Sequence, residues 1–311
     1  ICHMKNISVL LFLLITLALN AQNNKTSGLN ARQFHKYWKV ESESPDYKVT
    51  FLGDTVEILS PKGLTLWRKE KMSGKVTIEY DACVVVEVEG DRLSDLNCFW
   101  MASDPEYPDN IWKREKWRNG IFQNCYSLQL YYMGYGGNYN STTRFRRYDG
   151  NEAAIMEAGL RPSILKEYTD AEHLLKANHW YHIKITNENN RVSYYIDGKR
   201  LVDFRDTEPL TEGWFGFRTT LSRTRITNFH YEYSPHQTST VPLHWIGDTP
   251  EQDKAVSFGI PFDEGDVFPA TPLRLTTSRN QEIPVDTWPL AYWPDGSVKW
   301  SGVAGVIPAG T

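Results

Sequence analysis

Residues Trp180–Asp206 read WYHIKITNENNRVSYYIDGKRLVDFRD, and this stretch decides the fold. It contains the runs HIKIT, VSYYI and LVDF, which are rich in the β-branched and aromatic residues typical of strands. Asn187–Asn190 separates the first run from the second, and Asp197-Gly198 separates the second from the third. An Asp-Gly pair favours a tight hairpin turn. The stretch therefore predicts consecutive antiparallel hairpins.

Strand signals of the same kind continue on both sides of this stretch, from Trp38 to Tyr233. They include KVTIEYDACVVVEVEG, SLQLYYMGY, TRFRRYDG, GWFGFRTT and RITNFHYEY. Helical composition is confined to Glu152–Ala158 and Asp170–Ala177, each about two turns long. Many short strands with regular turns are typical of a sandwich or jelly roll. We therefore predict an all-β fold, a jelly-roll β-sandwich over residues 38–233.

The amino-terminal sequence indicates export. Met4-Lys5 precedes the apolar run Ile7–Leu19, and the small residue Ala21 precedes a polar stretch. This pattern predicts a cleavable signal peptide over residues 4–21, followed by a polar leader over residues 22–37. The apolar run is shorter than the ~20 residues that span a bilayer. We expect a periplasmic or extracellular protein without membrane association after signal cleavage.

A change of composition near Tyr233 predicts a second domain. Residues 234–240, SPHQTST, have the composition of a linker, and residues 241–311 are richer in proline. A β domain of about 70 residues buries little surface by itself. We therefore expect residues 241–311 to be the first part of a truncated barrel-like β domain, with missing carboxy-terminal domains of the same polypeptide as its partners.

Charge and composition exclude several classes of partner. The chain has 34 Lys and Arg residues against 38 Asp and Glu residues, so it has no general attraction for nucleic acid. The cysteines after the signal, Cys83, Cys98 and Cys125, are odd in number and favour buried free thiols; no spacing suggests zinc. No cofactor is predicted with certainty. Oxygen-rich loops at residues 103–109 and 149–152 leave a structural calcium ion open, although neither has EF-hand spacing.

One strand carries an unusual concentration of arginine. In Thr142–Tyr148, alternation places Arg144 and Arg146 on one face with Thr142 and Tyr148, and Arg147 on the other. Two guanidinium groups on one face suit the carboxylate of a uronic acid, which each can bind with two hydrogen bonds. The alternative is that both arginines pair with acids of neighbouring strands, such as Asp95 or Asp149. We favour the ligand over the ion pairs.

The flanking residues have the chemistry of a sugar site. Sugar C–H faces lie on aromatic rings, while sugar hydroxyls bond to tyrosine and amide side chains. The alternative for the aromatic residues is core packing, and alternation makes Tyr131 and Met133 core residues if Tyr132 faces the ligand. The predicted substrate-binding residues are Asn97, Trp100, Tyr132, Tyr135, Asn138, Asn140, Arg144, Arg146 and Arg218. No residue is predicted to be a metal ligand.

Two segments resemble known families. GLTLWRKEKMSGKVTIEYDA, LYYMGYGGNYNSTTRFRRYDG, HWYHIKI and GWFGFRT occur in the order in which the YesU-like family of concanavalin-A-like β-sandwiches has them. That family occurs in bacterial gene sets for degrading rhamnogalacturonan. VSFGIPFDEGDVFPATPLRL with WPLAYWPDGSVKW resembles the start of the amino-terminal barrel domain of exo-rhamnogalacturonan lyase-like proteins. The resemblances imply the front part of a modular protein acting on acidic plant or algal polysaccharide, such as rhamnogalacturonan or ulvan.

Three hypotheses for the sandwich follow. It binds glycan as a non-catalytic module of a lyase, it is itself a polysaccharide lyase, or it is a structural spacer. A lyase needs a cation for the carboxylate and groups that move protons, for which Tyr132, Tyr135 and His182 are the candidate catalytic residues. We rank the binding module first and leave open whether the sandwich is an enzyme.

Overall fold

The computed structural model describes residues 27–151, 153, 157, 161–234, 242–269, 271, 273–277 and 281–311. The predicted signal peptide, most of the predicted linker and most of Glu152–Ala158 lie outside the described residues. Within the described part of the chain, no helix is long and apolar enough to cross a membrane.

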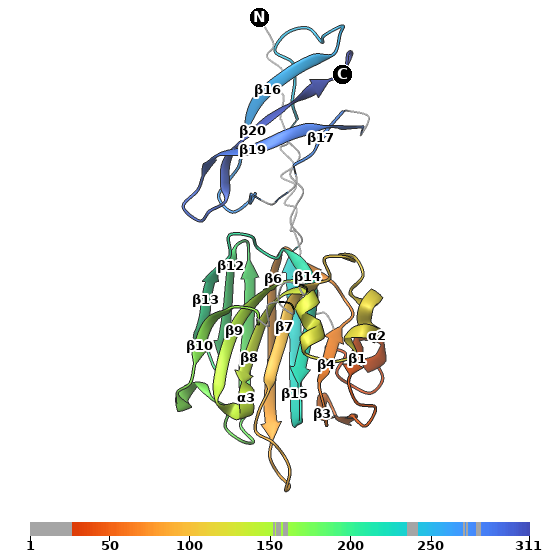
Figure 1. The fold of residues 1–311 in the computed structure, drawn as a ribbon, viewed down its shortest axis with the longest axis vertical. Helices are drawn as coiled ribbons and strands as arrows, with labels where there is room; N and C mark the ends of the chain where they lie inside the picture. Colours follow the sequence, from red (N-terminus) through yellow and green to blue (C-terminus); the bar gives the residue numbers. More distant parts are fainter. Residues whose placement is uncertain are drawn as a thin grey trace, which may run out of the picture.

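The first part of the chain is a sandwich of two antiparallel sheets, the front sheet and the back sheet (Figure 1). The front sheet has the order β1 (Trp38–Ser42), β4 (Leu64–Arg68), β14 (Glu212–Thr219), β7 (Leu96–Ser103), β8 (Gln129–Gly136), β9 (Thr142–Asp149) and β10 (Ile164–Tyr168), and β5 (Met72–Ser73) pairs with β14. The back sheet has the order β13 (Lys199–Arg205), β12 (Arg191–Ile196), β11 (Tyr181–Glu188), β6 (Lys75–Val85), β15 (Ser222–Ser234), β3 (Thr55–Ser60) and β2 (Lys48–Leu52). Neighbours in space are often distant in sequence, as in a jelly roll, so the predicted fold class is confirmed.

The predicted hairpins are β11, β12 and β13 of the back sheet. Asp197 and Gly198 both have positive φ angles, 49° and 79°, as a tight primed turn requires. The first turn is shorter than the sequence suggested, because Asn187 pairs with Val192 and Glu188 with Arg191.

The space between the sheets is filled by one large apolar cluster. It includes Trp38, Trp100, Tyr131, Phe145 and Tyr194, all almost fully buried. The cysteines Cys83, Cys98 and Cys125 are buried free thiols, and burial raises the pKa of Cys98 and of Cys125 to about 12.

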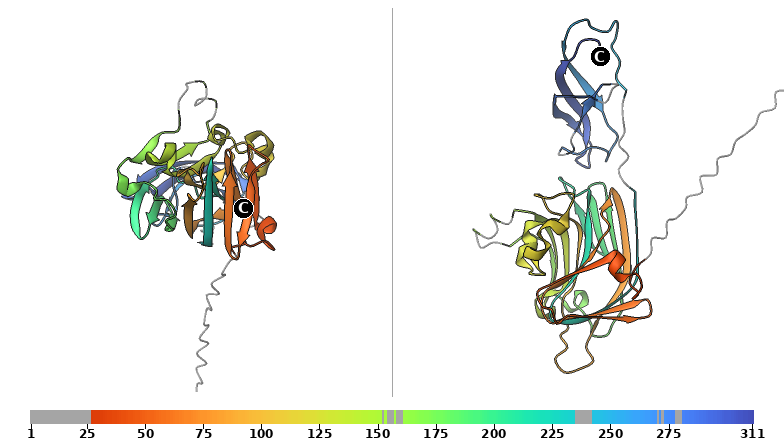
Figure 2. Two further views of the ribbon diagram at one scale, coloured as in Figure 1. Left: turned by 90° about the horizontal axis from the view of Figure 1, so that it is seen from below. Right: turned by 90° about the vertical axis from the view of Figure 1, so that its right-hand side faces the viewer.

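A segment with three short helices covers part of the outer side of the front sheet (Figure 2). We call residues 104–128 the cover segment; it contains η1 (Ile111–Arg114), α2 (Glu115–Arg118) and η2 (Gln123–Ser127). Its Ile111, Tyr126 and Leu128 join a second buried cluster with Trp67 and Phe99 of the front sheet. The sandwich therefore has an apolar cluster outside the front sheet as well as the one between the sheets.

Further short helices are α1 (Phe34–Tyr37), α3 (Gly137–Asn140) and η3 (Ala171–His173). The predicted helix Asp170–Ala177 is wrong beyond η3, because Leu174 is extended and both backbone polar groups of Leu175 bond to the side chain of Asn140. This tertiary contact overrides the local helix propensity.

The second part of the chain consists of β-sheets, in agreement with the predicted all-β fold. Its main sheet is antiparallel, in the order β16 (Lys254–Pro261), β20 (Val298–Ile307) and β19 (Val285–Tyr292). A small two-stranded sheet consists of β17 (Leu275–Thr276) and β18 (Glu282–Ile283).

Candidate functional site

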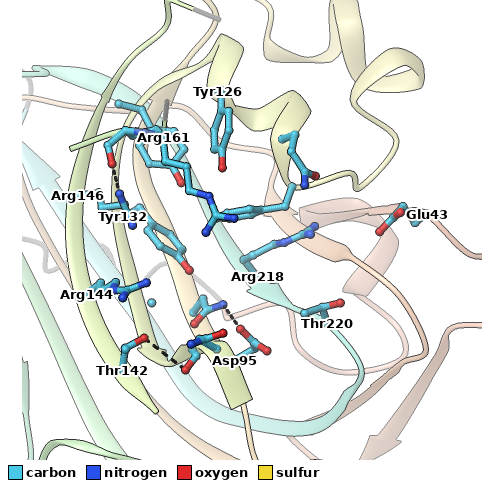
Figure 3. A pocket seen from close by; sticks show the side chains of 18 residues that line it. Glu43, Asp95, Tyr126, Tyr132, Thr142, Arg144, Arg146, Arg161, Arg218 and Thr220 are labelled. Atoms are coloured by element: carbon cyan, nitrogen blue, oxygen red, sulfur yellow. Dashed lines mark hydrogen bonds between the residues drawn. The ribbon is translucent and has the colours of Figure 1, made fainter. Parts of the chain in front are cut away.

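A pocket of about 300 Å³ lies on the outer side of the front sheet, next to the cover segment (Figure 3). We call it the arginine pocket. It is lined by Glu43, Asp95, Asn97, Phe122, Gln123, Tyr126, Tyr132, Gly134, Gly137, Asn138, Thr142, Arg144, Arg146, Tyr148, Arg161, Pro162, Arg218 and Thr220. Strands β7, β8, β9 and β14 form its floor, and the cover segment and the residues before β10 form its walls.

Strand alternation explains which side chains reach the pocket. On β9, Thr142, Arg144, Arg146 and Tyr148 line it, whereas Phe145 packs between the sheets. The same applies to the other floor strands. On β8, Tyr132 points outward and Tyr131 and Met133 point into the core, and on β14, Arg218 points outward next to the inward Phe217.

Ion pairs brace the cover segment internally and attach it to the sandwich. Arg114 donates two hydrogen bonds of 2.7 Å to the fully buried carboxylate of Asp104. Arg118 donates a hydrogen bond of 2.9 Å to Glu41 of β1. These pairs hold Phe122 and Tyr126 over the edge of the pocket.

The arginines of the pocket differ in how they are neutralised. Arg144 forms an ion pair with Glu167 of β10. Arg146, 8% exposed, donates to the carbonyl oxygen of Pro162, and Arg218, 3% exposed, donates to the carbonyl oxygen of Gly120 and to Thr65. Within the described residues, no carboxylate lies within ion-pair distance of Arg146 or Arg218. Neither guanidinium therefore forms a direct ion pair in the described structure, although the charge of Arg218 acts to lower the pKa of Glu41.

Two buried polar atoms in the pocket also have no hydrogen-bond partner in the described structure. They are the Tyr148 hydroxyl, on a side chain that is 1% exposed, and Asn97 Oδ1. The amide nitrogen of Asn97 donates to Asp95 Oδ1 at 3.1 Å, and Asp95 Oδ2 accepts hydrogen bonds from Ser94 and Arg92. Since buried polar atoms are normally paired, these two are available to hydroxyl groups of a ligand.

The tyrosines of the pocket remain protonated at neutral pH. Burial, and next the negative charge of Asp95, raise the pKa of Tyr132 above its usual range, although Arg218 and Arg146 act in the opposite direction. Burial also raises the pKa of Tyr126 and of Tyr148. These hydroxyls can donate hydrogen bonds, and none of them is prepared to act as a base.

Most of the predicted binding residues meet in this pocket. Those that the structure brings together are Asn97, Tyr132, Asn138, Arg144, Arg146 and Arg218. The alternative, that the arginines pair with acids of neighbouring strands, is confirmed for Arg144, which forms an ion pair with Glu167 of β10. Its partner is neither Asp95 nor Asp149, and Arg146 forms no ion pair within the described residues.

Three predicted binding residues lie elsewhere. Trp100 is fully buried between the sheets against Tyr131 and Tyr194, because it is three positions from the outward Asn97 and so faces inward. Tyr135 lies on the same face of β8 as Tyr131, so it also points inward. Its hydroxyl donates a hydrogen bond to the carbonyl oxygen of Leu174. The third, the side chain of Asn140, is occupied by the backbone of Leu175.

His182, a predicted catalytic residue, belongs to the back sheet. Its Nδ1 lies 2.7 Å from Asp81 and its Nε2 lies 3.3 Å from Glu79, both on β6. It does not line the arginine pocket. His182 and the pocket arginines therefore do not belong to one site, contrary to the prediction that they act together.

Several residues of the arginine pocket were not among the predicted binding residues. Tyr148 shares a face with Arg144 and Arg146, so alternation alone could have identified it. Arg161, Phe122 and Tyr126 come from outside the floor strands, and no local pattern marks them.

In the two loops considered for a calcium ion, Asp104 and Asp149 have other partners. Asp104 is bound by Arg114, and Asp149 accepts a hydrogen bond from the backbone of Asn151. Among the described residues, the group of potential ligands close enough for a metal is Asp170, Glu172 and His173, in neither of those loops.

Comparisons with known proteins agree with this architecture. A structure from Bacillus subtilis, titled a protein of unknown function with galectin-like fold, has a TM-score of 0.52 at 15% identity, covering 65% of this chain and 91% of that one. The carbohydrate-binding module CBM66 from Bacillus subtilis gives a TM-score of 0.42 at 17% identity, covering 63% of this chain and 94% of that one. The first likeness shows the sandwich fold.

Two comparisons concern smaller parts of the sequence. Residues 239–311 match the model of the PcRGLX-like N-terminal RIFT barrel domain. A 65-residue stretch is 33% identical to the uncharacterized protein YetA of Bacillus subtilis (strain 168), covering 21% of this chain and 8% of that relative. The chain thus matches only a small part of that relative's length.

The match of residues 239–311 agrees with a barrel-like second domain, whereas membership of the YesU-like family stays a prediction. Residues 58–229, more than half of the chain and most of the sandwich, match the model described as domain of unknown function (DUF6250). The chain belongs to the DUF6250 family.

Proposed function

We propose that the sandwich binds an acidic glycan in the arginine pocket, with the carboxylate of a uronate sugar between Arg146 and Arg218. The observation that carries this proposal is the pair of buried guanidinium groups without a carboxylate partner in the described residues. A buried charge is stable only when it is paired, and a guanidinium binds a carboxylate with two parallel hydrogen bonds. A ligand carboxylate supplies the missing negative charge.

The rest of the pocket suits a sugar ring. The Tyr148 hydroxyl and Asn97 Oδ1 are free to bond to sugar hydroxyls, and the ring of Tyr132 offers an apolar surface between them. Arg144, already paired with Glu167, adds hydrogen-bond donors rather than net charge. The pocket therefore offers positively charged groups for one carboxylate and several neutral groups for hydroxyls, as a uronate requires.

The sandwich acts as a binding module of a larger exported protein that degrades polysaccharide. The similarity of residues 239–311 to a barrel domain of rhamnogalacturonan-lyase-like proteins supports this role, as does the signal-peptide pattern at residues 4–21. A module that holds the polymer raises the substrate concentration at a linked catalytic domain. Rhamnogalacturonan and ulvan are the substrate classes to test first.

Catalysis by the sandwich itself is the second candidate, favoured by Tyr132 beside the arginines. β-Elimination removes the C5 proton of a uronate and breaks the C4–O bond to form a C4–C5 double bond, so it needs a base as well as a cation. The raised pKa of Tyr132 opposes its use as a base, and the described residues that line the pocket include no histidine or lysine. Binding is therefore better supported than elimination.

One experiment distinguishes these functions. The protein is run in affinity gels containing polygalacturonate, rhamnogalacturonan, ulvan or neutral dextran, and the same mixtures are followed at the absorbance of unsaturated uronates. We expect retardation by the acidic polymers alone, weaker at high salt because the contact is ionic, and constant absorbance. Rising absorbance would establish a lyase, and equal mobility in every gel would leave the sandwich as a spacer.

A further inference from the structure

The turn between β8 and β9 has an unusual backbone. Asn138, Tyr139 and Asn140 are consecutive residues with positive φ angles of 51°, 58° and 56°. L-residues rarely adopt this conformation, and tyrosine less readily than asparagine. The turn is held by hydrogen bonds of 2.9 and 2.8 Å between the Asn140 side chain and the backbone of Leu175. The fold thus maintains a strained turn that projects one aromatic side chain.

That side chain, Tyr139, is 75% exposed. The guanidinium of Arg92 lies 4.1 Å from the centroid of its ring. Arg92 is itself held by hydrogen bonds to Ser94 at 3.0 Å and to Asp95 at 2.9 Å. An aromatic ring supported in this way loses little conformational entropy when a second group packs on it.

Tyr139 is continuous with the arginine pocket. Asn138, its neighbour in the chain, lines the pocket, and so does Asp95, which holds Arg92. Figure 3 shows Asp95 and Thr142 at one end of the pocket and Arg161 and Tyr126 at the other. Through Asn138 and Arg92, Tyr139 therefore lies next to the Asp95 end of the pocket.

We propose that Tyr139 is a stacking platform for the sugar next to the uronate in the arginine pocket, so that the site binds at least two linked sugars. This inference rests on the proposed function. Sugar C–H faces pack on exposed aromatic rings, and the positive charge of Arg92 is compensated by Asp95, so this end presents an apolar surface without excess charge. The next sugar of the same glycan fits that surface.

The test compares galacturonic acid with a rhamnogalacturonan backbone tetrasaccharide by isothermal titration calorimetry. Two variants remove the aromatic ring, Tyr139→Ala and Tyr139→Asn. Asparagine is included because it tolerates the left-handed backbone conformation of this position. We expect both to bind the tetrasaccharide about tenfold more weakly, the scale of an aromatic stacking contact, and to bind the monosaccharide like wild type. Tyr139→Phe keeps the ring and should match wild type, as should Trp180→Ala, which removes an exposed aromatic residue outside the pocket.

The other outcomes are decisive in different ways. Unchanged tetrasaccharide affinity in both variants overturns the platform while leaving the arginine pocket intact. An equal loss for both ligands shows that Tyr139 only supports the pocket, which also overturns it. If wild-type protein binds neither ligand, the proposed function fails and the platform fails with it.

Discussion

Arg118 of the cover segment donates a hydrogen bond of 2.9 Å to Glu41 of strand β1, and both side chains are buried. The two residues are 77 positions apart in the chain. Burial raises the pKa of Glu41, while Arg118 acts to lower it. The contact joins the segment that walls the arginine pocket to the edge of the front sheet, so pocket geometry and stability depend on the same ion pair.

Removing one member of this pair should be costly. We expect Arg118→Met to lower the free energy of unfolding by about 3–5 kcal/mol, because the Glu41 carboxylate is left buried and unpaired. Denaturant unfolding measures it. Lys39→Met, which removes the more exposed ion pair with Glu115, serves as the control and should cost at most about 1 kcal/mol. The double variant Arg118→Met/Glu41→Leu should recover part of the loss; equal costs for the two single variants would contradict this account.

The arginines should contribute unequally to glycan binding. Arg146→Ala and Arg218→Ala should each weaken binding of the rhamnogalacturonan tetrasaccharide by about 1.5–3 kcal/mol, the range for hydrogen bonds to charged groups. Arg144→Ala should lose less than about 1 kcal/mol, since Arg144 is already paired with Glu167. Calorimetry gives the affinities, circular dichroism confirms folding, and Arg200→Ala on the back sheet is the matched control. Equal losses at Arg144 and Arg146 would be incompatible with the carboxylate position proposed.

The hydroxyl of Tyr148 should separate stability from binding. Tyr148→Phe removes a buried polar atom that has no partner in the described structure, so we expect the unliganded protein to become more stable by up to about 1 kcal/mol. Affinity for the tetrasaccharide should fall, because the ligand can no longer form a hydrogen bond with this hydroxyl. Thermal melts and calorimetry measure the two effects. A less stable variant with unchanged affinity would show that Tyr148 serves the fold alone.

His182 should titrate above the ordinary histidine value. The hydrogen bond to Asp81, with further help from Glu79, raises the pKa of His182 above 6.5. The stabilisation from this charged histidine is complete below pH 6.5 and is lost as the pH rises through the folded-state pKa. Proton NMR of the imidazole gives the midpoint, which should fall in Asp81→Asn and should not respond to bound glycan. A wild-type midpoint at or below 6.5 would refute this assignment.

Local sequence patterns predicted those parts of the site that are built on strands. Strand alternation placed Arg144, Arg146 and Tyr132 on the outer face, because side chains of a regular strand alternate strictly. The same rule, applied throughout, would have excluded Tyr135, because it lies on the same face of the strand as the core residues Tyr131 and Met133. The predictions went wrong where aromatic composition was given more weight than position.

The walls of the pocket could not be predicted in the same way. Phe122 and Tyr126 reach the pocket because a distant ion pair, Arg118 with Glu41, fixes the cover segment. Likewise, Asp170–Ala177 has helical composition, but Asn140 binds its backbone in another conformation. Such contacts depend on the assembled sheets and leave no periodic signal in the sequence.

The division between inward and outward positions on β7, β8, β9 and β14 has an evolutionary consequence. Phe145 and Tyr131 maintain the core, whereas Arg144, Arg146 and Tyr132 on the same two strands contact only the pocket side. Outward residues can therefore be exchanged with little effect on the packing between the sheets. Related sandwiches can diversify in the ligands that this face binds while inheriting one unchanged scaffold.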